Sequence, residues 1–361
     1  MIVALDATPL TVETGGVARY TSELARALAL RYTEDKFWLV SDQPFEMLNH
    51  APANLQAGAG PRSGAERKWW LWGLRRELAR INATLFHGTD FSVPYAKSRP
   101  NVMTLHDLSP WMERAWQSEA GRVRRRTPLL LRLGFVTRLI TPSEAVRKAA
   151  IDRFGLDPQR IAAVPLAAGE CFKPTPQAPS ETPYLLYVGT LEPRKNIPLL
   201  IEAWREVRKQ FPIDLVLAGR ARGDFQLPSP EPGLRILGAV PEQDLPALYT
   251  GALAFVYPSL YEGFGLPVLE AMQCGALVVT SRDPAISEVV GTGSAIQVDA
   301  TQGRPLVEAL LALARLPTSF ASLRARAVER AREFTWKRTA EGTRDVYDDA
   351  RRAFRNKKKK R

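Results

Sequence analysis

Cysteine and histidine are scarce in this chain, which has two cysteines and three histidines among 361 residues. Cys171 and Cys274 stand alone and lack the spacing of a metal site, and nothing in the composition calls for a disulfide, so we expect both to be reduced and structural. The sequence has no Asp-x-Asp pair, and His50, His87 and His106 are not arranged as a group of ligands. These absences favour an activity that needs no metal.

Long hydrophobic runs are also missing. No apolar run approaches the length of a membrane span. Residues 1–6 (MIVALD) lack the basic-then-apolar order of a signal peptide and predict a first β-strand, so we expect a cytoplasmic protein. With 361 residues, 45% of them hydrophobic, the chain is long enough for two globular domains, each with its own core.

Positive charge is abundant and local. The net charge is +12, and residues 351–361 alone hold eight basic and no acidic side chains. We expect residues 355–361 to form a disordered basic tail, which has the charge to bind nucleic acid nonspecifically but predicts no specific nucleic-acid partner. Residues 62–80 and 120–143 each hold six further basic side chains, with two acidic ones in the first segment and none in the second.

Apolar residues accompany both basic segments. Trp69, Trp70 and Trp72 lie in the first, and residues 129–131 (LLL) and Phe135 lie in the second. Such segments resemble amphipathic helices that meet an anionic membrane surface, which would place the protein on the inner face of the cytoplasmic membrane. The alternative is that the tryptophans and leucines are core residues and the arginines a solvated face.

Short apolar or β-branched runs alternate with amphipathic stretches along the chain, a pattern typical of doubly wound parallel sheets covered by helices. Strands are expected near 1–6, 37–41, 83–87, 101–106, 137–141 and 161–165, and again near 184–188, 213–218, 234–238, 252–257, 276–280 and 295–298. Helices in the first half are expected near 16–31, 66–81, 122–134 and 143–154. The fold class is therefore α/β with two similar sheets.

A proline-rich stretch marks the boundary between the two sheets. Three prolines interrupt regular pairing between residues 168 and 180, so we expect a first domain at 1–170, a linker at 171–182 and a second domain at 183–335. Ligands of such sheets lie beyond the carboxyl ends of the strands. The polar segments just past the expected strands are 6–19, 87–90, 106–107, 189–196, 219–220 and 259–270, and a cleft between facing domains would collect them.

The most informative of these segments is 262–270 (EGFGLPVLE), which follows the apolar run 253–258. Its glycines let backbone N–H groups approach a ligand, and Pro267 suits the first position of a helix whose dipole favours anions. Glu262 and Glu270 are acceptors that suit paired hydroxyls. The segment predicts a site for a polyol joined to phosphate, although a capped helix with two surface glutamates fits the spacing too.

Two other loops fit the same ligand. Arg194 and Lys195 follow an expected strand and are placed to stabilise the diphosphate that departs when a sugar–phosphate bond breaks. Gly16 opens an expected helix and is a candidate for backbone donation to phosphate, unless 15–16 is a plain turn. Residues 58–60 (GAG) imitate a dinucleotide fingerprint but lack a preceding strand, so we dismiss them.

Three stretches together resemble the retaining, nucleotide-sugar-dependent glycosyltransferases of family 4 (glycosyl transferase group 1), which have the GT-B fold. Residues 262–279 resemble that family's paired-glutamate motif, 188–196 its phosphate-binding loop and 15–20 its amino-terminal glycine turn. Similar segments extend from about residue 1 to about residue 350. The resemblance implies two Rossmann-like domains facing a cleft, an acceptor-binding one at 1–170 and a nucleotide-sugar-binding one at 183–335. It also implies a final helix at 336–354 that crosses back to the first domain.

The resemblance also assigns roles to residues. It implies that Lys195 binds the diphosphate, that Glu270 binds ribose hydroxyls, and that Glu262 contacts the donor sugar. The full set it implies comprises the catalytic residues His106, Glu262 and Lys195, and the donor-binding residues Gly16, Arg194, Lys195, Gly263, Phe264, Gly265, Leu266 and Glu270, with no metal ligand. Many members carry arginine where this chain has Thr190, so Arg194 or Arg220 is expected to substitute, unless these arginines are structural.

The function implied is transfer of a hexose, with mannose from GDP-mannose favoured, from a nucleotide-diphosphate sugar to a growing, lipid-linked surface polysaccharide. Anomeric configuration would be retained by same-face substitution, without a separate general base and without a cofactor. Two alternatives stay open. A nucleotide-sugar epimerase or phosphorylase would share the fold, and a non-catalytic scaffold that binds acidic polymers would use the basic segments.

Overall fold

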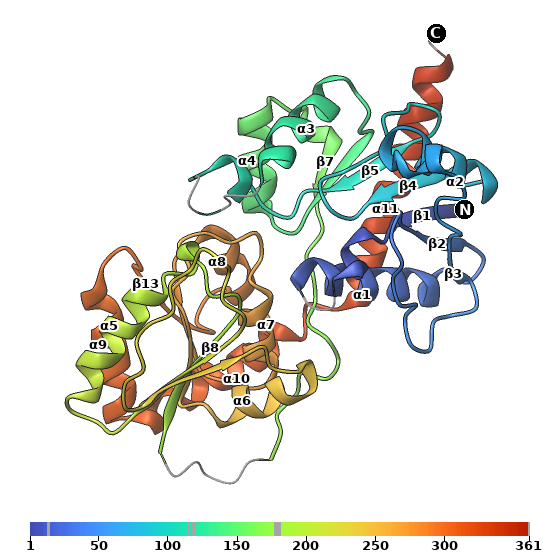
Figure 1. Ribbon diagram of the computed structural model, residues 1–361. Helices are drawn as coiled ribbons and strands as arrows, with labels where there is room; N and C mark the ends of the chain where they lie inside the picture. The colour runs from blue at the N-terminus through green and yellow to red at the C-terminus, as the bar shows by residue number, and fades with distance from the viewer. Residues whose placement is uncertain (13–14, 114–115, 117–119, 177–181, 360–361) are drawn as a thin grey trace. The chain divides into compact units, whose positions relative to one another are not determined.

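The computed structural model describes residues 1–12, 15–113, 116, 120–176 and 182–359 (Figure 1). The chain forms two compact units. Unit 1 comprises Met1–Met112, Gln117–Leu166 and Thr335–Arg361, and unit 2 comprises Glu113–Trp116 and Ala167–Phe334. The first division therefore falls after Leu166, ahead of the proline-rich stretch, and the second falls just before the final helix.

Unit 1 is built on a parallel sheet of seven strands in the order β3-β2-β1-β4-β5-β6-β7. The strands are β1 (Ile2–Asp6), β2 (Lys36–Val40), β3 (Leu55–Ala57), β4 (Leu85–Gly88), β5 (Asn101–Thr104), β6 (Arg138–Thr141) and β7 (Ile161–Ala163). Its longer helices are α1 (Gly16–Arg31), α2 (Leu74–Arg80), α3 (Gly121–Arg132), α4 (Glu144–Phe154) and α11 (Trp336–Lys359). Its short helical turns are η1 (Thr8–Thr11), η2 (Gly64–Arg67), η3 (Trp69–Gly73), η4 (Ser109–Trp111) and η6 (Pro158–Arg160).

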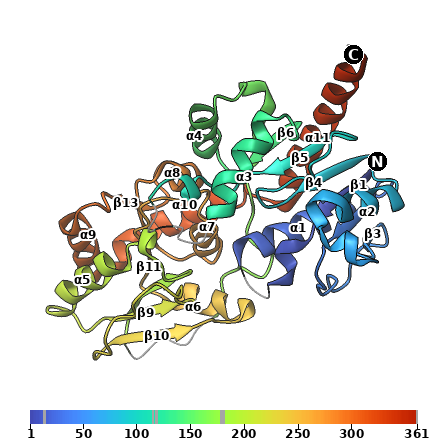
Figure 2. The same cartoon turned by 45° about the horizontal axis from the view of Figure 1, so that its top comes forward.

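The helix α11 comes from the far end of the chain and completes unit 1. It packs along α1, and the two helices lie side by side in both views (Figure 1 and Figure 2). Arg31 of α1 pairs with Glu341 of α11, and Arg344 pairs with the buried Asp35. Because βαβ crossovers are right-handed, α1, which leads out to β2, and α2, which leads back to β4, cover opposite faces of the sheet.

Unit 2 repeats the plan with six parallel strands in the order β10-β9-β8-β11-β12-β13. The strands are β8 (Tyr184–Val188), β9 (Asp214–Ala218), β10 (Leu234–Gly238), β11 (Ala254–Tyr257), β12 (Val278–Ser281) and β13 (Ile296–Val298). Its helices are α5 (Ile197–Arg208), α6 (Leu245–Gly251), α7 (Leu266–Gln273), α8 (Pro284–Val290), α9 (Gly303–Arg315) and α10 (Ala321–Ala331), with the turns η7 (Pro193–Lys195), η8 (Glu242–Asp244) and η9 (Pro317–Phe320). The predicted α/β class with two doubly wound parallel sheets is confirmed.

Three predicted details are wrong. The stretch 66–81 is not one helix, because η2 and the π-helical turn η3 precede α2, and a Cβ at Gly73 would lie 2.0 Å from the carbonyl oxygen of Glu66. Strand β3 was not expected, since its three residues include a single buried side chain, Leu55. The final helix continues to Lys359, beyond the predicted end at 354, so residues 355–359 of the supposed disordered tail are helical and residues 360–361 lie outside the described residues.

Ion pairs along α11 explain why it continues. Arg344 pairs with Asp348 one turn on, and Asp348 and Asp349 lie one turn before Arg351 and Arg352. No proline or glycine occurs between residues 343 and 359 to end the helix.

Among the described residues, no single helix combines the length and the apolar composition needed to cross a membrane. The segments Gly303–Arg315 and Pro317–Ala331 meet both criteria only when taken together, and the chain bends by 109° between them.

Candidate functional site

The loop after β8 carries the predicted phosphate-binding cations. After Gly189 the chain turns through η7 into α5, and the turn is closed by Asn196, whose φ of 57° lies in the left-handed region that asparagine tolerates. This geometry directs the Lys195 side chain inward, where the residue is only 5% exposed. A lysine this buried needs a partner for its charge.

Glu262 is that partner. Lys195 Nζ donates to Glu262 Oε1 at 2.5 Å and to the hydroxyl of Tyr257 at 2.6 Å, while Arg194 Nη1 donates to Glu262 Oε2 at 3.1 Å. Each oxygen of one carboxylate therefore holds one cation. The structure brings together, within unit 2, the three charged residues that the sequence singled out from two loops 67 residues apart.

Lys195, Arg194 and Glu262 belong to a larger ionic cluster that also includes Glu192 and Arg222, which the sequence did not predict. Arg194 Nε lies 2.8 Å from Glu192 Oε1, and Glu192 Oε2 lies 3.0 Å from Arg222 Nη1. Glu192, Arg222 and Tyr257 were missed as site residues. Arg222 follows the end of β9 by four residues, so its place past a strand end was the one signal that could have indicated it.

Charge and burial set opposing effects on these groups. Burial alone would raise the pKa of Glu262, but Lys195 and Arg194 outweigh it and lower that pKa to about 2. Burial and the neighbouring Arg194 lower the pKa of Lys195, against the opposing effect of Glu262. The carboxylate of Glu262 is thus firmly ionised and pairs with both cations, and Arg194 has a second carboxylate partner in Glu192.

The turn that follows Glu262 is shaped for close approach. Gly265 has a φ of 98°, a left-handed conformation, and α7 begins at the next residue, so Pro267 occupies the second helical position, not the first. The backbone N–H of Glu262 donates to Asp283 Oδ2 at 3.2 Å, and Ile286 N donates to Oδ1 at 3.0 Å. Burial raises the pKa of Asp283 to about 6. Asp283 therefore fixes the turn between two helices.

Two more predicted donor-binding residues are buried around this turn. Phe264 packs edge-on against Phe334 with ring centroids 5.8 Å apart. Glu270, on α7, is 2% exposed, and its Oε2 lies 3.0 Å from the hydroxyl of Tyr249. Gly263 and Leu266 complete the turn. Arg220, the other candidate to replace the arginine absent at Thr190, is exposed at the end of β9, whereas Arg194 belongs to the ionic cluster.

The remaining predicted site residues, Gly16 and His106, belong to unit 1. Gly16 is exposed and begins α1, as predicted. His106 lies just past β5, and its Nε2 donates to the carbonyl oxygen of Thr89 at 2.7 Å. Since burial lowers its pKa, the ring is neutral, and its Nδ1 is then an acceptor. The catalytic role that the resemblance implies for His106 stays a prediction.

His87 proves to be structural. Its Nδ1 lies 2.7 Å from the hydroxyl of Tyr347 on α11, and its Nε2 lies 2.8 Å from Thr104 Oγ1, which in turn meets Tyr20 Oη at 2.8 Å. Burial lowers the pKa of His87 to about 3, so this chain of contacts is neutral. His50 is exposed. Within the described residues, no group of three or more His, Cys, Asp or Glu is placed to hold a metal ion.

Comparisons with known proteins cover both units. Residues 14–168 match the model of the family described as Glycosyltransferase Family 4, and residues 171–334 match that described as Glycosyl transferases group 1. The O-antigen chain mannosyltransferase B of Escherichia coli is 34% identical, over 94% of this chain and 97% of the relative. The chain therefore belongs to the family 4 glycosyltransferases.

Other relatives are more distant. The O-antigen chain mannosyltransferase RfbU of Salmonella typhimurium is 26% identical over 69% of this chain and 70% of its own length. Among solved structures, the sucrose-phosphate synthase of Thermosynechococcus elongatus superposes with a TM-score of 0.76 at 18% identity, covering 97% of this chain and 98% of that one. This likeness confirms the GT-B class of fold.

Proposed function

We propose that this glycosyltransferase moves mannose from a nucleotide-diphosphate donor, GDP-mannose, to a growing surface polysaccharide, with retention of configuration and without a metal. The mannosyltransferase names of the relatives support the sugar and the glycan product. The observation that carries the proposal is the pair of buried cations, Lys195 and Arg194, held on one carboxylate beside the turn that opens α7.

A bound donor diphosphate would replace Glu262 as the partner of Lys195 and Arg194. It brings negative charge to the two cations, which then no longer need Glu262, and the carboxylate becomes free to accept hydrogen bonds from the donor sugar. At an effective dielectric near 20, a cation about 4 Å from a developing charge interacts by about 4 kcal/mol before desolvation is subtracted. Lys195 and Arg194 therefore supply the stabilisation of the leaving group that a divalent metal supplies in other enzymes.

We assign the Glu262 carboxylate, once the diphosphate has replaced it on the two cations, to hydrogen bonds with the donor sugar, and we name no covalent nucleophile in the cluster. We therefore propose same-face substitution, in which the leaving diphosphate helps to deprotonate the acceptor hydroxyl. We assign the buried Glu270, whose Oε2 accepts from the hydroxyl of Tyr249, to the ribose hydroxyls of the donor.

Donor binding and transfer test this proposal together. Purified protein would be titrated with GDP-mannose, UDP-glucose and the free nucleotides in EDTA, and the anomeric configuration of the product would be read by NMR. We expect GDP-mannose to raise the melting temperature and to be consumed with retention. Loss of transfer in EDTA that added divalent metal restores would overturn metal independence, and an inverted product would overturn the mechanism.

We also propose that an anionic membrane surface binds unit 1. Arg126 on α3 stacks over Trp70 of η3, 4.4 Å from the ring centroid, and over Tyr95 at 5.1 Å, so the two basic segments form one surface. Exposed apolar side chains occur in both segments, with exposures of 49% for Leu71, 54% for Trp72, 39% for Leu129 and 44% for Leu133. The alternative of core tryptophans and leucines holds for Trp69, Leu130 and Leu131, which are 2%, 0% and 5% exposed.

Vesicle flotation tests the membrane surface. Replacing Trp72 with serine removes an exposed indole that would enter the interface, so we expect weaker binding to anionic vesicles. Leu316→Ser is the matched control, because Leu316 is 62% exposed but lies in unit 2. Equal flotation of all three proteins, or none at low salt, would contradict the proposal.

A further inference from the structure

A second cationic site lies in unit 1, at the opposite end of its sheet from His106. A cavity of about 330 Å³ opens beside Thr84 and Pro100, which come directly before β4 and β5. Each of these strands has four residues, so the cavity is separated from the carboxyl ends of the strands by roughly 13 Å. It is therefore distinct from the strand ends at which family members bind their substrates.

Arginines dominate this cavity. Eight residues line it, and none of them is acidic. Its polar and aromatic lining is Thr84, Ser98, Arg99, Arg351, Phe354 and Arg355. The lining holds three guanidinium groups and no carboxylate, and one of the three, Arg351, pairs with Asp348 outside the lining, so the cavity keeps a net positive charge.

The arginines differ in how firmly they are held. Arg99 Nη1 donates to the carbonyl oxygens of Leu78 and Ala83, both at 2.9 Å, which fixes the plane of its guanidinium group and leaves its other nitrogens for a ligand. Arg351 Nη1 lies 3.8 Å from Asp348 Oδ1, beyond hydrogen-bonding distance. Within the described part of the chain, no ion pair is recorded for Arg355.

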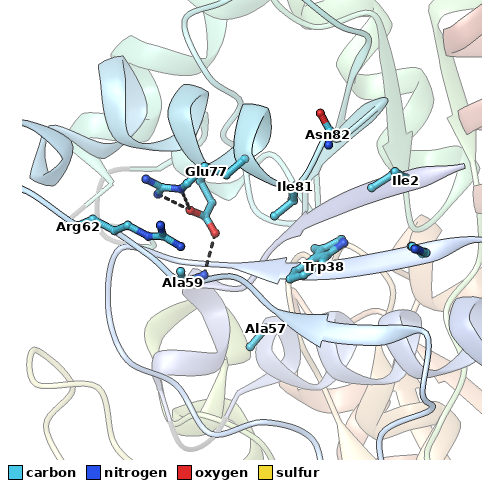
Figure 3. Close-up of a pocket in the computed structure, with 10 residues that line it drawn as sticks. Ile2, Trp38, Ala57, Ala59, Arg62, Glu77, Ile81 and Asn82 are labelled. Atoms are coloured by element: carbon cyan, nitrogen blue, oxygen red, sulfur yellow. Dashed lines mark hydrogen bonds and ion pairs between the residues drawn. The ribbon is translucent and has the colours of Figure 1, made fainter.

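A larger cavity nearby shows what a compensated site looks like. It has a volume of about 480 Å³ between α2 and strands β1–β3 (Figure 3). There, Arg80 donates to Glu77 Oε2 at 2.9 Å from Nε and to Glu66 Oε2 at 3.1 Å from Nη1. Its guanidinium group is thus paired with carboxylates, and the backbone N–H of Ala59 donates to Glu77 Oε1 at 2.8 Å. The lining of that cavity also includes Lys36 and Arg62, so the two cavities differ in whether a carboxylate lies in the lining and holds an arginine, and not in the sign of their charge.

We propose that the arginine cavity formed by Arg99, Arg351 and Arg355 binds a phosphate group. Planar guanidinium groups match the oxygens of a phosphate in paired hydrogen bonds, and a site with a fixed arginine loses less entropy on binding. The wall formed by Phe354 admits a small apolar portion beside the phosphate. The chemical class is therefore a phosphate ester, supplied either by an anionic phospholipid headgroup or by a soluble phosphorylated compound.

The basic end of α11 adds to this attraction. Residues 356–361 carry five basic side chains and no acidic one, directly after the cavity residue Arg355. Burial, and after it the charge of Arg75 on α2, lowers the pKa of Arg99. An anion would thus be drawn to the region by long-range attraction and held by the three arginines.

Matched variants of α11 distinguish binding by the cavity arginines from nonspecific attraction to a positively charged helix. Arg351→Gln and Arg355→Gln each remove one cavity arginine, whereas Arg352→Gln removes the same charge from a side chain that is 69% exposed and does not line the cavity. Binding of the full-length protein would be measured by calorimetry with glycerol 3-phosphate and by flotation with phosphatidylcholine vesicles containing phosphatidylglycerol. Arg99 is left intact, because it also supports two backbone carbonyls.

We expect the two cavity variants to bind at least about tenfold more weakly than Arg352→Gln, which should resemble the parent. Binding of glycerol 3-phosphate as tight as that of vesicles would identify a soluble source, and binding of vesicles alone would identify the lipid. Equal losses in all three variants would overturn the proposal in favour of nonspecific attraction, and so would the absence of binding to both probes.

Discussion

Polar side chains are buried near the strand ends of both units, but the interactions that stabilise them differ. In unit 2, Lys195 and Glu262 are both buried and meet as ions. In unit 1, His87 is also buried, but it is kept neutral and meets the hydroxyls of Thr104 and Tyr347. One sheet therefore ends in a cluster of charges, and the other in a network of neutral hydrogen bonds.

This difference indicates what each set of groups is suited to contact. Burying ions costs several kcal/mol each, and the cost is recovered only by close partners, so a charged ligand that pairs with these ions could replace one of those partners. A donor diphosphate is such a ligand. Neutral donors and acceptors suit sugar hydroxyls, whose hydrogen bonds need no counter-charge. The comparison predicts that charge matters for chemistry in unit 2 and that neutrality matters for stability in unit 1.

The largest effect is expected for Lys195→Ala. It removes a cation that the proposed diphosphate would bind, so kcat/KM for transfer should fall by at least about a hundredfold, the scale seen when one stabilising donor is lost. Steady-state kinetics with GDP-mannose would measure it. Lys209→Ala is the control, because Lys209 is 67% exposed and pairs only with Glu206 at the surface. Comparable rates for the two variants would refute the role of Lys195.

Glu262→Gln should affect stability and its dependence on pH. With the folded pKa at about 2 and the ordinary value at 4.5, ionised Glu262 stabilises the fold above pH 4.5, and this contribution is lost as the pH falls toward 2. The variant leaves Lys195 without its carboxylate partner and Arg194 with Glu192 alone, so it should lose about 3 kcal/mol at pH 7, and the gap to the parent should shrink on acidification.

Urea unfolding at a series of pH values measures this gap. Glu333→Gln provides the comparison, since Glu333 is exposed and pairs with Arg330 at the surface, where such pairs contribute little. A gap between Glu262→Gln and the parent that does not change with pH would show that Glu262 stabilises the turn by shape and not by charge.

His87→Gln tests the neutral network of unit 1. The folded pKa of about 3 lies below the ordinary value of 6.5, so the unfolded chain binds a proton first, and the parent loses stability as the pH falls from 6.5 toward 3. Glutamine does not titrate, so the variant does not share this loss. From pH 7 to pH 5, its free energy of unfolding should therefore rise by about 2 kcal/mol relative to that of the parent.

Two further buried carboxyls titrate in the same pH range, so the pH profile of the parent's stability alone would not isolate His87. Burial raises the pKa of Asp6 to about 7 and that of Asp90 to about 6, so both carboxyls favour the folded state as the pH falls. Because Asp6 and Asp90 titrate in the parent and in the variant, the difference between the two unfolding curves isolates His87. Parallel curves would mean that His87 has the same pKa in the folded and the unfolded protein, and so would contradict the lowered pKa.

The strands and loops of both sites could be predicted because their causes are local. The apolar runs that form β8 and β11, and the glycines that follow them, lie in continuous sequence, so Lys195, Glu262 and Glu270 were found before their contacts were known. The same local logic failed at 64–80, where consecutive aromatic residues and the tight approach of Gly73 to Glu66 break the expected helix.

What could not be predicted depends on distances across the fold. Arg222 and Glu192 are 30 residues apart and become partners only because β8 and β9 are neighbours in the sheet. Periodicity could not reveal that His87 reaches Tyr347, 260 residues away, since the contact depends on how α11 packs on unit 1. Such pairings follow from tertiary packing and leave no pattern in the sequence.

The smallest expected effect is that of Tyr257→Phe, which separates the hydroxyl from the ring. The hydroxyl accepts a hydrogen bond from Lys195 Nζ at 2.6 Å, and the ring centroid lies 5.0 Å from the same nitrogen. Phenylalanine keeps the ring and its attraction for the cation, so the loss should be that of one hydrogen bond, about 1 kcal/mol, or roughly fivefold in kcat/KM. Tyr184→Phe is the control, because that hydroxyl donates to Leu248 outside the ionic cluster. A hundredfold loss in Tyr257→Phe alone would mean that the neutral hydroxyl takes part in the chemistry, and the contrast between an ionic unit 2 and a neutral unit 1 would have to be redrawn.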